Sequence, residues 1–119
     1  MPGALEAVLA CLSNRPQLEI EDWAEQTKLD GIDPEVARFV FDFFATRGVP
    51  MGKVRLDDRL EADLQLNKAL PQEWGDEFQE EFMDRFGVSK LFRPGPPPAT
   101  VREFLLFVQQ ELSDWRSRL

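Results

Sequence analysis

Two stretches of this chain place large apolar residues three or four positions apart, and each stretch begins with a proline and ends at a glycine. Residues 34–48 carry the repeat Val36, Phe39, Val40, Phe43 and Phe44. Residues 71–87 carry the repeat Trp74, Phe78, Phe82 and Phe86. This spacing forms one face of an α-helix, proline is favoured in the first turn, and glycine is favoured directly after the last turn. The pattern predicts two amphipathic helices, the first capped by Asp33, whose aromatic faces belong to a buried core.

A third amphipathic helix is predicted after residue 100. Thr100 and Glu103 have the spacing of a capping box. The apolar face of this helix would consist of Val101, Phe104, Leu105, Val108, Leu112 and Trp115. Residues 93–98, which precede it, are rich in proline. We interpret them as a stiff connector between helices rather than as a ligand for an aromatic groove.

The first thirty residues have weaker patterns. Residues 3–12 are expected to form a helical stretch in which Cys11 is a small core residue. Residues 18–29 do not settle a period, although one side of a short helix there would carry Trp23, Ala24 and Thr27. The apolar run in residues 4–12 contains Glu6 and follows no cation, so we expect a buried helix rather than a secretion signal, in a cytoplasmic protein.

Residues 49–70 contain Pro50 and Gly52 and show no sustained period. They predict a long ordered loop with a short turn around residues 57–60. Four leucines of this loop are expected to reach the core: Leu56, Leu60, Leu64 and Leu66. Four acids in it imitate a calcium site: Asp57, Asp58, Glu61 and Asp63. Because the calcium-loop pattern with its central glycine is absent, we expect a solvated acidic loop instead.

The composition excludes several kinds of chemistry. The 119 residues include no histidine and one cysteine, which rules out imidazole catalysis and an internal disulfide. The formal charge of −8 argues against nucleic acid or an anionic membrane as the main partner. We find no glycine-rich phosphate loop, no metal-ligand spacing and no nucleophile paired with a base by a motif. We therefore expect no enzyme activity, cofactor, metal or small-molecule ligand.

Most of the negative charge lies in one region. Residues 61–86 contain eight acidic and two basic residues, a local balance of −6. Five of these acids follow helical spacing: Glu73, Asp76, Glu77, Glu80 and Asp84. Such a charge run either only solvates a helix or also steers a basic partner, and the pattern alone leaves both interpretations open.

Three segments, in order, resemble the acyl carrier protein family. Residues 59–66 (RLEADLQL) are similar to the family's DLGxDSLD turn, and residues 76–88 (DEFQEEFMDRFGV) to its acidic helix ending in EEEFG. Residues 99–108 (ATVREFLLFV) are similar to its last helix, which opens with TVGDLVxxI. The resemblance covers residues 34–117. It implies an all-α, acyl-carrier-like bundle of four main helices over residues 34–119, with up-and-down packing, a long ordered loop and an extra N-terminal helical element over residues 1–33.

The chain departs from this family at the attachment site. Carrier proteins hold 4'-phosphopantetheine on a serine at the start of the acidic helix. The matching positions here are Gln65, Leu66, Asn67, Lys68, Ala69 and Leu70, and no serine occurs between residues 14 and 88. The resemblance therefore implies the carrier fold without its prosthetic group, as in the serine-lacking carrier-like bacterial proteins of unassigned function. The acidic helix that carriers present to their enzymes is retained.

Three functions remain open at this point. The first is a non-catalytic interaction module that docks one set of acids on a basic protein surface: Glu73, Asp76, Glu77, Glu80 and Asp84. The alternative is an immunity or antitoxin-like inhibitor of a basic toxin or nuclease. The third is an atypical acyl carrier. The sequence leaves open the partner's identity, the oligomeric state, and whether a core cavity holds an acyl chain.

Overall fold

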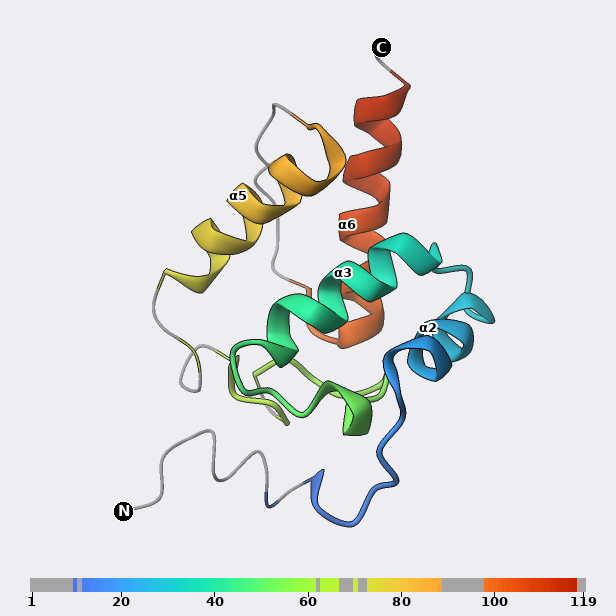
Figure 1. Cartoon of the computed structure of the whole chain (residues 1–119), viewed down its shortest axis with the longest axis vertical. Helices are drawn as coiled ribbons and strands as arrows, with labels where there is room; N and C mark the ends of the chain where they lie inside the picture. Colours follow the sequence, from blue (N-terminus) through green and yellow to red (C-terminus); the bar gives the residue numbers. More distant parts are fainter. Residues whose placement is uncertain are drawn as a thin grey trace.

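The computed structural model describes residue 10 and residues 12–61, 63–66, 70, 73–88 and 98–117. This part of the chain forms four α-helices and one short 3-10 helix: α2 (Ile20–Lys28), α3 (Pro34–Ala45), η1 (Met51–Lys53), α5 (Trp74–Phe86) and α6 (Val101–Arg116) (Figure 1). The prediction of an all-α bundle is confirmed. Within the described ranges, no helix has both the length and the apolar character needed to cross a membrane. Three predictions lie outside these ranges: the helix over residues 3–9, the burial of Cys11 and the connector over residues 93–97.

The predicted helix ends are set by local hydrogen bonds. The Asp33 carboxylate accepts from the Glu35 N–H at 2.8 Å, and Pro34 opens α3. Helix α3 ends at Ala45, three residues before the predicted stop. Helix α5 ends at Phe86 and is capped by Gly87, whose φ of 69° is favoured by glycine and whose N–H donates to the Met83 carbonyl. The undecided segment forms α2, with a buried side made of Trp23, Ala24 and Thr27.

The core is built mainly from aromatic side chains of α3 and α5. The Phe78 ring centroid lies 5.0 Å from that of Phe43 and 5.3 Å from that of Phe39. It also lies 5.2 Å from the Phe104 ring of α6, so three helices meet at this residue. Phe78 and Phe82 are buried, as predicted, whereas Trp74 and Phe86 are half-buried. Edge-on ring pairs of this kind add to the free energy gained by burial alone.

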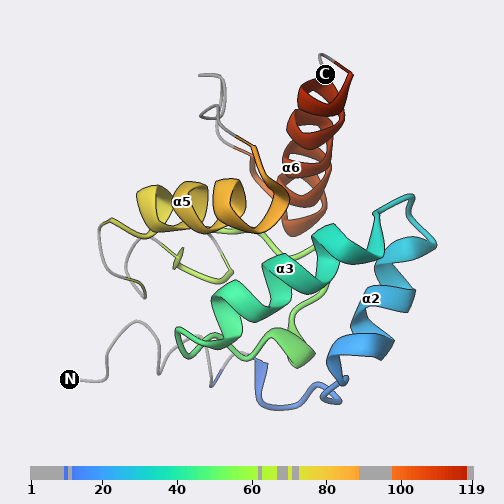
Figure 2. The ribbon, with the colours of Figure 1, turned by 45° about the horizontal axis from the view of Figure 1, so that its top comes forward.

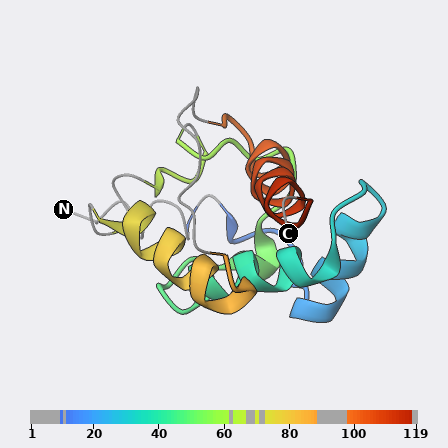
Figure 3. The ribbon, with the colours of Figure 1, turned by 90° about the horizontal axis from the view of Figure 1, so that it is seen from above.

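Helix α6 lies steeply across α3 and α5 instead of along them, so the prediction of up-and-down packing is wrong for α6 (Figures 1 and 3). Seen from above, α6 is viewed nearly along its axis, while α3 and α5 lie across the view (Figure 3). The loop after α3 explains the difference, because it supplies core side chains of its own. Leu60, Leu64 and Leu66 are buried, as predicted, and face Val40 of α3 and other core residues. This loop therefore forms part of the core.

The start of α6 is held by that loop. The N–H of Val101 donates to the Asp58 carbonyl at 2.9 Å, and the N–H of Arg102 donates to the Leu56 carbonyl at 3.0 Å. The Thr100 hydroxyl accepts from the Glu103 N–H, as the predicted capping box requires. The Glu103 carboxylate, however, accepts from the Ala99 N–H, one residue before the helix cap. The first backbone N–H groups of α6 are thus satisfied by the loop and the cap.

Residues before Pro34 share the core with the rest of the chain. Leu12, Trp23 and Ile32 are buried in the same apolar cluster as the aromatic residues of α3 and α5. The Trp23 indole N–H donates to the Val54 carbonyl at 2.9 Å. The N–H of Leu18 donates to the Gly52 carbonyl at the same distance. The described part of the N-terminal element is therefore integrated by both apolar and backbone contacts.

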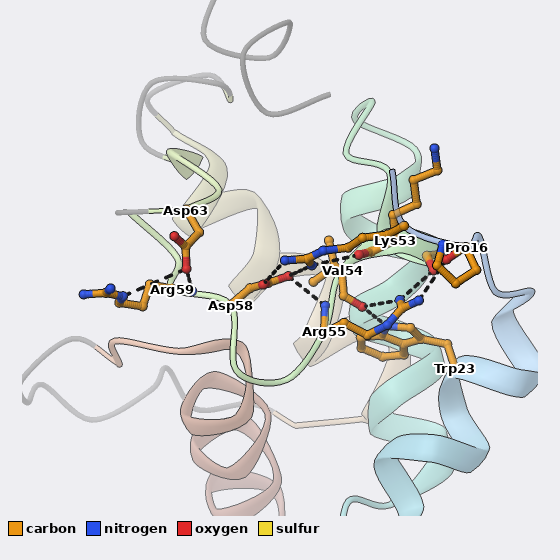
Figure 4. Close-up of polar contacts among 10 residues, drawn as sticks. Pro16, Trp23, Lys53, Val54, Arg55, Asp58, Arg59 and Asp63 are labelled. Carbon is orange, nitrogen blue, oxygen red and sulfur yellow. Dashed lines mark hydrogen bonds and ion pairs between the residues drawn. The ribbon is translucent and has the colours of Figure 1, made fainter. Parts of the chain in front are cut away.

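The prediction of a solvated acidic loop is wrong for Asp58. Its side chain is 7% exposed and accepts from the Arg15 guanidinium and from the Arg55 N–H at 2.8 Å (Figure 4). A buried carboxylate is stabilised only when charged or polar donors replace water, and here the charged donor, Arg15, comes from 43 positions away. Asp57 is exposed and pairs with Arg102, and this hydrogen bond raises the arginine's pKa above its ordinary value. In the described ranges, no three potential ligand side chains gather to hold a metal.

Candidate interaction surface

Helix α5 turns its acids away from the core. Phe78 and Phe82 are 2% and 1% exposed, which fixes the buried side of the helix. Each residue turns the helix by about 100°, so Glu80, two positions from each phenylalanine, points in nearly the opposite direction. The predicted acids cluster around the same direction. Figures 1 and 2 show α5 at the periphery of the molecule, beside α3.

The five predicted residues divide into two groups. Four are exposed and, within the described part of the chain, form no ion pair: Glu73, Asp76, Glu80 and Asp84. We call these four the acidic face. They occupy positions three or four apart, where like charges repel by a few tenths of a kcal/mol per pair, about 0.2–0.5. Repulsion of this sign opposes folding, whereas the helix dipole favours Asp76 in the first turn, so helix stability explains the acidic face only in part.

Glu77 is the exception, because it belongs to an internal ion pair. Arg47, at the end of α3, places Nη2 3.1 Å from a Glu77 oxygen and 2.6 Å from a Glu81 oxygen. Its guanidinium carbon lies 3.8 Å from the centroid of the Phe43 ring, and its side chain is only 21% exposed. The arginine thus ties α5 to α3 and neutralises part of the predicted docking set. Sequence reasoning did not identify Arg47, since no local pattern links residues 30 positions apart.

The positions that match the carrier serine are partly described. Leu66 and Leu70 are buried, and the Leu70 N–H donates to the Leu66 carbonyl at 3.0 Å. Gln65 adopts a φ of +50°, which is uncommon for a residue other than glycine. Asn67, Lys68 and Ala69 lie outside the described residues. The described side chains at this site are therefore an amide and two buried leucines, none of which offers a hydroxyl.

The centre of the core leaves little empty space. A void bounded by Val40, Phe44, Val49 and seven further apolar residues has a volume of about 10 Å³. About 10–15 Å³ is needed for one water molecule, so a chain of methylenes does not fit. The expectation of close packing holds for this part of the core.

Comparison of the chain with family models, with curated proteins and with solved structures gives no match.

Proposed function

We propose that the chain is a non-catalytic, acyl-carrier-like interaction module that docks the acidic face of α5 on a basic surface of a partner protein. The observation that carries the proposal is a set of four carboxylates that form no ion pair with described residues, on one side of a helix whose other side is anchored in the core. Fixed carboxylates on a rigid element attract and orient a cationic surface before contact. The resemblance to carrier proteins supports the same helix as the docking element.

The charge distribution elsewhere in the chain supports this assignment. Four arginines of other segments are engaged with other carboxylates: Arg15 with Asp58, Arg38 with Glu21, Arg47 with Glu77 and Glu81, and Arg102 with Asp57. None of these four neutralises the acidic face, and Arg85, in the last turn of α5, forms no ion pair with it within the described residues. The void beside Val40 and Phe44, in the described part of the core, is too small for an acyl chain and gives no support to acyl sequestration.

The test reverses two charges of the acidic face. The variant Glu80→Lys with Asp84→Lys leaves Arg47 and its partners unchanged, and we expect it to retain the helicity of the wild type. Proteins recovered on immobilised wild-type chain are compared with those recovered on the variant by quantitative mass spectrometry. For a partner recovered only on the wild type, we expect slower association with the variant and a weaker dependence of that rate on ionic strength.

A matched control separates local docking from net charge. Asp22→Lys with Glu25→Lys makes the same change in net charge at two exposed positions of α2, which form no ion pair within the described ranges. We expect this control to keep at least most of the wild-type association rate. Equal recovery and an equal salt dependence for wild type and the α5 variant would exclude the acidic face from the interface.

A further inference from the structure

A second surface lies between the α2–α3 turn and the C-terminal half of α6. A groove of about 620 Å³ opens there, with Ile32 and Val36 on one side and Leu112 on the other. These three residues are at most 2% exposed, so the floor of the groove is apolar and firmly packed. Figures 1 and 2 show the turn beside α6, and Figure 3 places α2 and α5 at opposite sides of α3. The groove is thus separate from the acidic face.

The two walls of the groove are fixed to each other. The Gln109 side chain of α6 donates to the Gly31 carbonyl at 3.0 Å and accepts from the Asp33 N–H. Both partners belong to the α2–α3 turn. A preformed groove of this kind needs little ordering when a ligand binds, which preserves affinity.

Unpaired cations converge on this groove. In the described part of the chain, three cationic side chains form no ion pair or hydrogen bond: Lys28, Arg85 and Arg116. Each stands in the last turn of its helix, where a cation is favoured by the helix dipole. Lys28 and Arg116 line the groove, whereas Arg85 does not. Asp33 is the acidic residue among those that line the groove. The lining therefore carries a net charge of +1, whereas the whole chain carries −8.

An exposed leucine marks the same groove. Only two large hydrophobic residues are strongly exposed among those described, Leu29 at 89% and Leu106 at 41%. Leu106 lines the groove, where a docked aliphatic side chain would cover it. On α6 the lining extends from Leu106 to Arg116, which corresponds to about 15 Å along the helix. About five extended residues at about 3.3 Å each span this length.

We propose that this groove binds a short segment of a partner protein that carries an aliphatic anchor side chain flanked by carboxylates. The anchor packs against the exposed side chain of Leu106, and the carboxylates face Lys28 and Arg116. The segment and the groove are complementary, because the groove offers apolar surface to the aliphatic anchor and unpaired cations to the carboxylates.

A selection with random short peptides tests the proposal. A phage-displayed peptide library is selected against the immobilised full chain, and enriched peptides are synthesised and titrated by fluorescence anisotropy. We expect the enriched peptides to share Leu, Ile, Val or Met with neighbouring Asp or Glu. Leu106→Gln should weaken their binding by about tenfold or more, because the covered apolar area is lost. Lys28→Glu and Arg116→Glu should each weaken it and reduce its sensitivity to salt.

Two matched controls make the result specific to the groove. Leu29→Gln removes the other exposed leucine, and Arg85→Glu reverses the third unpaired cation, which also lies in the last turn of its helix. Both should bind the peptides as the wild type does. The proposal is overturned by basic consensus peptides, by no enrichment, or by equal losses in the controls. Two further outcomes would also overturn the proposal. One is binding of decanoate, a fatty acid, in the groove when no peptide binds. The other is a wild-type dimer that Leu106→Gln dissociates, which would make a second copy of the chain the occupant.

Discussion

Arg15 binds Asp58 through both of its terminal nitrogens, at 2.6 and 2.9 Å, across 43 positions of sequence. The same guanidinium donates to the Lys53 carbonyl at 3.0 Å. The Asp58 side chain is 7% exposed and that of Arg15 is 34% exposed. This pair joins the segment before α2 to the loop that holds the start of α6, so it connects three parts of the fold.

Replacing Arg15 tests how much this connection contributes to stability. Arg15→Met keeps much of the side chain's apolar stem but leaves Asp58 buried without its cation. Loss of one partner of a buried pair costs about 3–5 kcal/mol, and because Arg15 is a third exposed we expect about 2–3 kcal/mol. Urea unfolding followed by circular dichroism measures the change. Arg59→Met, which removes the exposed pair with Asp63 at 3.9 Å, should cost at most about 1 kcal/mol; similar losses in both variants would contradict the finding.

Two glycines should respond in opposite directions to alanine. A Cβ on Gly52 would lie 2.4 Å from the Leu18 carbonyl oxygen, a backbone atom that cannot move aside without breaking the Leu18–Gly52 hydrogen bond. Gly52→Ala should therefore destabilise the fold by about 1–3 kcal/mol. A Cβ on Gly75, within α5, meets nothing within 4 Å, so Gly75→Ala should stabilise by about 0.5–1 kcal/mol. Thermal unfolding of the two variants checks both signs, and a stable Gly52→Ala variant would show that the close approach is absent.

Phe78 is expected to be the most sensitive position of α5. Its ring contacts aromatic residues of α3 and α6, so Phe78→Ala should cost about 3–5 kcal/mol through lost burial and the cavity left behind. Leu29→Ala, at a position 89% exposed, should change stability by less than about 0.5 kcal/mol. Denaturant midpoints provide the comparison. Wild-type stability in the Phe78 variant would mean that the buried side of α5 is assigned incorrectly.

Treatment with coenzyme A and a broad-specificity phosphopantetheinyl transferase should leave the intact mass unchanged. The reason is chemical, because the transfer needs a serine hydroxyl and residues 65–70 contain none. A conventional acyl carrier protein in the same reaction provides the positive control. A mass gain equal to the pantetheine arm would favour the atypical carrier over the interaction module.

Local features were readable from the sequence. The cap at Asp33, the glycine stop of α5 and the hydroxyl cap at Thr100 each involve residues within one helical turn. The buried stripe of Phe78 and Phe82 followed from spacing alone, and helical spacing also grouped the acids of α5. Such features depend on short-range geometry that a helix imposes on any sequence.

Tertiary structure decided which charged groups stay available and where the grooves lie. Spacing placed Glu77 among the docking residues, yet Arg47 binds it from 30 positions away, and Asp58 is buried by Arg15 instead of solvated. The walls of the groove meet through Gln109 and Gly31, which are 78 positions apart. Contacts of this kind leave no periodic trace, because partners distant in sequence are brought together only by the crossing of helices and the folding of residues 49–66 into the core.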